Sequence, residues 1–180
     1  MKRIYFDKIV TAVGFGLAVF LLIAAGLLNW GATFAADAVG SQLEAQAITL
    51  PAETGNKKES AQVTAFFKEN GEKIMTTGKQ AQMYADHYLG FHLSAMPAYA
   101  AASGANRAAA AALAANPNDP TLKADAAAKA GIVETVFKGT MLRGTLLTAY
   151  AFGTLGSIAA IAALVSLAGA GVMLLLSILG

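Results

Sequence analysis

The sequence predicts an all-α membrane protein in which two transmembrane helices flank a small extracytoplasmic helical domain. Of the 180 residues, 56% are hydrophobic and 13% are charged, whereas a soluble domain has about 25% charged residues. All charged residues lie in 1–8 or 37–143. The two charge-free stretches, 9–36 and 144–180, are therefore assigned as the transmembrane helices.

The first membrane segment, 9–36, follows an N-terminal segment, 1–8, that carries Lys2, Arg3 and Lys8. About 20 helical residues cross the hydrocarbon core, and Lys and Arg accumulate on the cytoplasmic side. We expect residues 1–8 to be cytoplasmic and 9–36 to be an uncleaved signal anchor. A cleaved signal peptide is the alternative, but its apolar core is shorter, at roughly 7–15 residues.

Residues 37–143 follow the first membrane segment and form the predicted extracytoplasmic helical domain. Within it, Ser41 to Glu59 is expected to be irregular, Ser60 to Asn70 a short helix, and Ala100 to Ala115 an Ala-rich helix. Alternating steps of three and four residues predict a heptad seam on one helix. Its members are Ile74, Thr77, Ala81, Tyr84, Tyr88, Phe91, Ala95 and Ala98. A second stripe, of Ala85, Leu89, Leu93 and Met96, predicts that this helix packs between partners, either its own domain or neighbouring chains.

A long outer helix is predicted to continue directly into the second membrane segment, 144–180. Asn116 to Asp119 reads as a turn, and Pro120 suits the first turn of a helix. An apolar stripe with a mean step of about 3.67 residues then predicts a nearly straight helix. The stripe comprises Leu122, Ala126, Ala130, Val133, Phe137, Met141, Gly144, Thr148, Phe152, Leu155 and Ala159. A kink between Gly139 and Gly144 is the competing expectation.

Small residues recur in both membrane segments at a spacing of four, which lets helix backbones approach closely in lipid. The pairs are Ala12 with Gly16, Gly14 with Ala18, Gly153 with Ser157, Gly156 with Ala160, and Ser166 with Ala170. Neither segment contains Asp, Glu, Lys, Arg or His. Since ion paths and proton relays need such groups, this argues against a pump or an ion channel.

The one cluster that resembles a chemical site is Tyr84, Asp86, His87, Tyr88 and His92. On one helix His87 and His92 point about 140° apart, so they cannot converge on a metal ion. Tyr88 and His92 are four residues apart, so His92 could form a hydrogen bond with Tyr88. The histidines are therefore read as structural, with a site shared between chains or a pH-sensitive contact as alternatives.

No phosphate-binding loop, dinucleotide fingerprint or nucleophile elbow occurs in the chain. The absence of cysteine excludes disulfides and thiolate chemistry, and a net charge of +2 without a basic cluster argues against a nucleic-acid partner. We expect no cofactor. Arg143 is placed at the outer membrane boundary, where it would reach lipid headgroups or pair with a carboxylate such as Glu134.

Several short motifs occur in order along most of the chain. They are Thr77-Gly78-Lys79-Gln80-Ala81, Tyr84-Ala85-Asp86-His87, His92-Leu93, Asn116-Pro117-Asn118-Asp119, Thr135-Val136-Phe137-Lys138-Gly139, Leu142-Arg143-Gly144 and Ala149-Tyr150-Ala151-Phe152. In this order the chain resembles uncharacterised actinobacterial two-span integral membrane proteins. The resemblance implies an anchor, an outer helical region and a Leu-Arg-Gly entry into the second membrane segment, and it implies no activity.

These patterns predict a non-catalytic accessory or scaffold subunit of a plasma-membrane assembly, or a homo-oligomer, that acts by helix packing. The expected partners are membrane lipids and other subunits. The expected interaction residues are Tyr84, Tyr88, Phe91, His92, Phe137, Arg143, Gly153 and Gly156. The alternatives are an outer ligand-binding or sensor module, with a pocket between residues 84–92 and 122–141, and an enzyme whose cofactor comes from another chain.

Overall fold

The fold of the chain is all-α, as the sequence predicts. The computed structural model describes residues 3–179, with side chains from residue 5 onward, so Lys2 and the side chain of Arg3 lie outside the described residues. Helices account for 83% of the chain. They are α1 (Arg3–Ala45), α2 (Ala61–Asn70), α3 (Gly78–Met83), the π-helix η1 (Tyr84–Leu89), α4 (Gly90–Ser94), α5 (Tyr99–Ala115) and α6 (Pro120–Leu179).

The helices form two compact units. Unit 1 consists of Met1–Gln42 and Ala151–Gly180, and unit 2 of Leu43–Tyr150. The long helices α1 and α6 each contribute to both units. Both contain an 18-residue window of mean hydropathy 2.4 and are long and apolar enough to cross a membrane.

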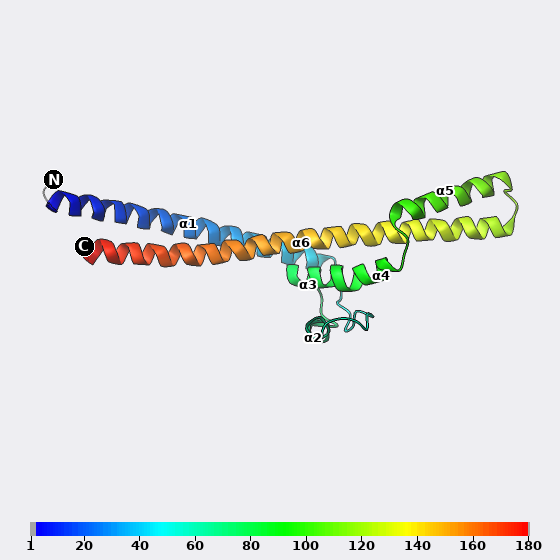
Figure 1. The fold of residues 1–180 in the computed structure, drawn as a ribbon, viewed down its shortest axis with the longest axis horizontal. Coiled ribbons are helices and arrows are strands. Elements are labelled where there is room, and N and C mark those ends of the chain that lie inside the picture. The colour runs from blue at the N-terminus through cyan, green and yellow to red at the C-terminus, as the bar shows by residue number, and fades with distance from the viewer. Residues whose placement is uncertain (1–2, 180) are drawn as a thin grey trace. The chain divides into compact units, whose positions relative to one another are not determined.

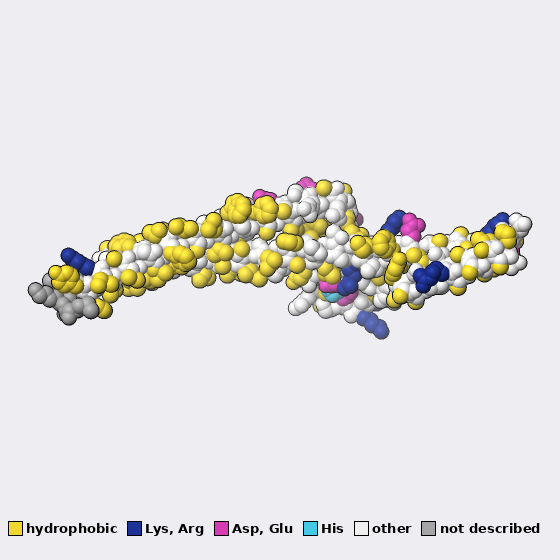
Figure 2. Space-filling view, turned by 90° about the horizontal axis from the view of Figure 1, so that it is seen from above, with side chains coloured by type: hydrophobic (Ala, Val, Ile, Leu, Met, Phe, Trp, Pro, Cys, Tyr) yellow, Lys and Arg dark blue, Asp and Glu magenta, His cyan; other side chains and the backbone are white. Residues whose placement is uncertain are grey.

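Unit 1 is a pair of helix segments that run antiparallel, with the N-terminal turns of α1 beside the C-terminal turns of α6 (Figure 1). Large apolar side chains point outward from both segments: Trp30, Leu164 and Val165 are 68%, 68% and 67% exposed. Figure 2 shows hydrophobic side chains covering much of the visible surface of these helices. Among the described residues, the buried hydrophobic residues of unit 1 are alanines and Val39, none more than 8% exposed.

The first part of unit 2 is a short irregular segment held against α2. Its core is Leu50, Phe67 and Met75, each no more than 1% exposed. Backbone hydrogen bonds between 48–50 and 72–75 join the two sides, including one antiparallel bridge from Thr49 to Ile74. The irregular segment is shorter than expected because α1 continues to Ala45. The predicted short helix is confirmed, and Ser60 caps it by accepting a hydrogen bond from the Val63 amide.

The second part of unit 2 is the hairpin of α5 and the N-terminal half of α6, residues 120–150. Ala102 and Ala109 of α5 are buried, at 3% and 7% exposure. Asp119 begins α6, because its carboxylate accepts hydrogen bonds from the amides of Thr121 and Leu122 at 2.7 and 3.2 Å. The predicted turn, cap and Ala-rich helix are all present. From Pro120, α6 continues without interruption to Leu179, so the glycines at 139 and 144 do not break it.

Candidate interaction sites

The candidate cluster around Tyr84 to His92 is built on a π-helical turn, η1. The helix that carries it begins with a capping box: Thr77 accepts from the Gln80 amide, and the Gln80 side chain accepts from the Thr77 amide. At the end of the π-helical turn the Gly90 amide donates to the Ala85 carbonyl, five residues earlier. Such wide turns often mark functional positions.

Arg143 of α6 holds the π-helical turn from outside the helix. Its Nε donates to the Ala85 carbonyl at 3.0 Å, and a terminal nitrogen donates to the Asp86 carboxylate at 2.9 Å. Gly90 leaves room for this approach, since a Cβ there would lie 3.3 Å from the Ala85 oxygen and 3.6 Å from Arg143 Nε. The Ala85 carbonyl therefore accepts from both the Gly90 amide and Arg143.

Arg143 pairs with a carboxylate, which was one of the expectations, but the partner is Asp86 and not Glu134. Glu134 instead pairs with Lys138 at 2.6 Å, one turn along the exposed face of α6. That hydrogen bond and charge lower the pKa of the Glu134 carboxyl. Arg143 instead faces the π-helical turn and bonds to Asp86. The two residues are 57 positions apart in the sequence, so no local sequence pattern could predict this pair.

An aromatic stack runs along the same helix. The rings of Tyr84 and Tyr88 are 4.9 Å apart, and those of Tyr88 and His92 are 4.4 Å apart. The Nδ1 of His92 donates to the backbone carbonyl of Tyr88 at 2.7 Å, so the expected hydrogen bond exists but uses the main chain instead of the phenol. Partial burial raises the pKa of the Tyr84 phenol, and the charge of Tyr88 adds to the effect.

His87 leaves this helix on another side and reaches Glu59, which the sequence analysis did not identify. The His87 Nδ1 lies 3.1 Å from a Glu59 carboxylate oxygen, and these side chains are 33% and 13% exposed. The Asn56 side-chain amide donates to the other Glu59 oxygen at 3.1 Å. This contact ties the irregular segment to η1 across 28 residues of sequence, so only the fold brings the two groups together.

The predicted heptad seam over 74–98 is not formed as one face. The helix covers only Gly78 to Ser94, Ile74 lies in the β-bridge, and Thr77 is the N-cap. The π-helical turn adds a residue to one turn and shifts the phase of all that follow. Ala81, before this turn, and Ala85, within it, are fully buried, whereas Phe91, beyond it, is 37% exposed.

The apolar stripe along α6 is largely exposed. Phe137, Met141 and Phe152 are 51%, 57% and 57% exposed. The buried positions are instead Val136 and Leu146, at 4% and 0% exposure. α6 packs through small residues and through side chains that neighbour the large aromatic ones in sequence, such as Val136 beside Phe137. The stripe that contains the largest apolar side chains therefore faces away from the packing surface. Phe137 forms one contact there, with the Tyr99 ring at 5.9 Å.

The small-residue seam in unit 1 is a second candidate interaction site. A buried position recurs every seven residues on each helix. These positions are Ala18, Ala25, Ala32 and Val39 on α1, and Gly156, Ala163, Ala170 and Ser177 on α6. Gly14, four residues before Ala18, is also buried. A Cβ on Gly14 would lie 2.1 Å from Ser177 Oγ, and one on Gly156 would lie 3.0 Å from the Ala35 Cβ. Gly156 therefore lies at a helix contact, as predicted, while Gly153 is half-buried.

Not every predicted small-residue pair lies in the seam. Gly16 faces open space, with nothing within 4 Å of a Cβ there. Ala12 and Ser157 are exposed. A spacing of four identified candidate positions, whereas the seam itself follows a spacing of seven, which keeps the contact on one side of each helix.

Neither site has the composition of a metal centre. In the part of the chain from Arg3 to Leu179, no group of three or more His, Cys, Asp or Glu residues could hold an ion. Comparison of the chain with protein-family models, curated proteins and solved structures found no match. The function is therefore argued from the geometry alone.

Proposed function

We propose that the chain is an integral membrane protein that serves as a non-catalytic accessory or scaffold subunit. The observation that carries the proposal is the small-residue seam of unit 1, which joins two long apolar helices while their large side chains point outward. Exposure of so extensive an apolar surface to water is unfavourable, whereas a bilayer or a membrane partner would cover it. The proposed topology is a cytoplasmic N-terminus with residues 37–143 outside the plasma membrane.

The seam also supports a position at which α6 enters the membrane. Gly14 lies against Ser177, and Ala35 lies against Gly156, so Asp37, two residues further along α1, is at the level of about Thr154. If Asp37 marks the outer edge of the bilayer, α6 enters the membrane near Thr154 and not at Gly144. The segment 154–179 still has ample length, because about 20 helical residues span the hydrocarbon core.

Subunit recruitment would use the exposed apolar residues of unit 2. Phe91 is 37% exposed, and Phe137 is 51% exposed beside Tyr99. Aromatic side chains of this kind often carry the binding energy of protein interfaces. Tyr84, Tyr88 and His92 stack within the helix and would support that surface.

The test is purification of the tagged chain in mild detergent, followed by mass determination in solution and quantitative mass spectrometry. We expect a stoichiometric assembly that Phe91→Asp or Phe137→Asp disrupts. Ala127→Asp is the matched control, since it places the same charge on an exposed position of α6. Recovery of a monomer alone would refute the accessory role.

A second candidate function is ligand sensing outside the membrane. A cavity of about 410 Å³ lies between residues 52–57 and the Thr64 and Phe67 side chains of α2. It differs from the pocket expected between 84–92 and 122–141, where a Cβ on Gly139 would lie 2.8 Å from the Leu93 side chain. A small molecule released from the natively purified chain, and missing from Thr64→Trp, would favour this function.

A further inference from the structure

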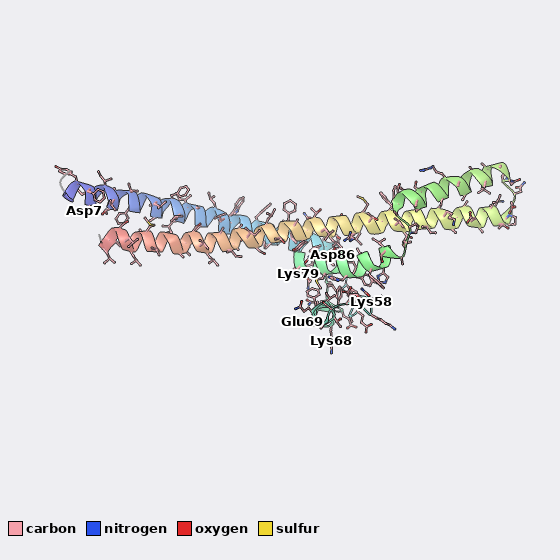
Figure 3. The ribbon with its side chains drawn as sticks, in the orientation of Figure 1. Asp7, Lys58, Lys68, Glu69, Lys79 and Asp86 are labelled. Carbon is pink, nitrogen blue, oxygen red and sulfur yellow. The ribbon has the colours of Figure 1, made fainter. Side chains whose placement is uncertain are left out.

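One exposed side of α1 carries a polar residue that the small-residue seam does not use. Side chains project from α1 along the helix beyond Asp7 (Figure 3). Five exposed positions follow one another at alternating steps of three and four residues, so they share one face of the helix. They are Val19, Leu22, Gly26, Asn29 and Thr33, and together they are called the Asn29 face. Nothing lies within 4 Å of a Cβ on Gly26, so the chain itself leaves this face open.

Asn29 is the only residue of the charge-free segment 9–36 that has an amide side chain. Among the side chains described, from Tyr5 to Leu179, that amide makes no hydrogen bond. The Thr33 hydroxyl, by contrast, donates to the backbone carbonyl of Asn29 at 3.0 Å. A side-chain amide has two N–H donors and one carbonyl oxygen to satisfy. Asn29 therefore presents donors and an acceptor together on the outside of unit 1.

In the proposed membrane orientation the Asn29 amide lies in the hydrocarbon core. Asp37 marks the outer edge of the bilayer, and Asn29 lies eight residues before it, which is about 12 Å along a helix. The headgroup region on each side of the core is only about 5–8 Å thick. The amide is therefore below the headgroups, where water does not reach it and an unpaired polar group costs free energy.

The other outward side of α1 has no such group. Its large side chains are between 58% and 68% exposed. They are Phe20, Ile23, Leu27, Trp30 and Phe34. Because large apolar side chains suit contact with lipid tails, this side is called the lipid side. The Asn29 face is the side of α1 that needs a hydrogen-bonding partner.

We propose that the Asn29 face is the interface of a parallel homodimer in which the two copies of Asn29 hydrogen-bond to each other. An amide is complementary to a second amide, because each supplies the donor and the acceptor that the other needs. Two copies with the same topology place Asn29 at the same depth, so a two-fold axis along the membrane normal brings the amides together. Lipid tails have no donor or acceptor to offer in their place. This inference rests on the proposed membrane insertion of unit 1.

Gly26 provides the close approach that this contact requires. It lies one turn before Asn29 on the same face, and the absence of a side chain there lets two helix backbones come together. A single Asn in an otherwise apolar helix interface also fixes the register of the two helices. The dimer is therefore expected to have one defined register, set by Asn29.

The first experiment is disulfide cross-linking of single-cysteine chains in liposomes, which is possible because the chain contains no cysteine. A disulfide between identical positions forms only where two copies meet near the two-fold axis. Leu22→Cys and Thr33→Cys should therefore cross-link severalfold faster than Ile23→Cys and Phe34→Cys. Each control is the next residue along the helix, so it lies at nearly the same depth but on the lipid side.

The second experiment measures the dissociation constant of the dimer by energy transfer between labelled chains in liposomes. Asn29→Val should weaken the dimer about threefold to tenfold, whereas Asn29→Gln, which keeps an amide, should retain most of the affinity. Gly26→Val should also weaken it. Gly16→Val is the matched control, because that glycine is likewise exposed with nothing within 4 Å of a Cβ but lies on the lipid side.

Equal cross-linking on the two sides of α1, or a dissociation constant that Asn29→Val and Gly26→Val leave unchanged, would overturn the proposal. Phe137→Asp should leave this dimer intact, because Phe137 belongs to unit 2. Extraction of the membranes with alkaline buffer reports insertion separately. A chain that stays in the membrane as a monomer would refute this inference alone, whereas a chain released into the buffer would also refute the proposed function.

Discussion

Gly14 lies at a contact between the helices of unit 1, against the side chain of Ser177. A methyl group there would lie 2.1 Å from Ser177 Oγ, so we expect Gly14→Ala to destabilise the chain by about 1–3 kcal/mol through overpacking. Ser177→Gly in the same chain should restore stability. Gly16→Ala, with nothing within 4 Å, is the control and should be neutral or stabilising. Thermal unfolding in detergent measures all four chains.

Arg143 contributes to unit 2 mainly through its bond to the Ala85 carbonyl. The Arg143 and Asp86 side chains are 42% and 34% exposed, so solvent limits their ion pair to about 1 kcal/mol or less. Arg143→Ala should cost about 1–3 kcal/mol and increase amide exchange in 84–90, because it also removes one of the two donors to the carbonyl of the buried Ala85. Asp86→Asn should cost less. An effect no larger than that of Lys138→Ala, which removes an exposed pair, would contradict this role for Arg143.

Tyr84 gives unit 2 a pH dependence at alkaline pH. Burial raises the pKa of its phenol above the ordinary value of 10.0, so folding favours the neutral form. The stability that this provides is fully present below pH 10.0 and is lost as pH rises through the folded-state pKa. The difference in phenolate absorbance between the wild type and Tyr84→Phe should show a midpoint above 10.0, and Tyr88→Phe should lower it. A midpoint at or below 10.0 would exclude burial as the dominant cause.

At the scale of the element, the continuity of α6 has a direct test. Gly131 and Gly144 lie inside the helix, and nothing lies within 4 Å of a Cβ at either position. Replacing each by Ala should stabilise the chain by up to about 1 kcal/mol, because Ala has a higher helix propensity. Loss of stability would indicate that one of these glycines allows a kink. Circular dichroism during thermal unfolding measures the stability of both variants.

Local signals predicted the ends of the helices better than their faces. Ser60 and Asp119 lie at predicted helix starts, and each caps a helix in the structure. Thr77, which was predicted inside a helix, is also an N-cap. The π-helical turn could not be predicted, because the contacts to Ala85 and Asp86 come from Arg143, more than 50 residues away. Since that turn changes the helical phase, the residues of the seam predicted over 74–98 do not share one face.

For the whole molecule, the charge-free segments predicted both long apolar helices. Hydropathy did not predict which residues of these helices pack against each other. Large side chains of the apolar stripe on α6, such as Phe152 and Leu155, are 57% and 60% exposed. Fully or nearly buried positions hold Ala18 and Ala170 instead. In lipid, large apolar side chains lose nothing by facing outward, whereas close backbone packing requires small residues. A search for small residues seven apart would have found the seam.

The proposed bilayer limit near Thr154 can be tested because the chain contains no cysteine. Single cysteines at Ala127, Thr148 and Ile161 all replace exposed positions of α6. A membrane-impermeant maleimide added to intact cells should label the first two, since they would lie outside, and should label the third only after detergent. Entry at Gly144 would protect Thr148→Cys. Labelling of Ala127→Cys only in inverted vesicles would instead reverse the proposed topology, while the contrast between positions 148 and 161 would still define where α6 enters the membrane.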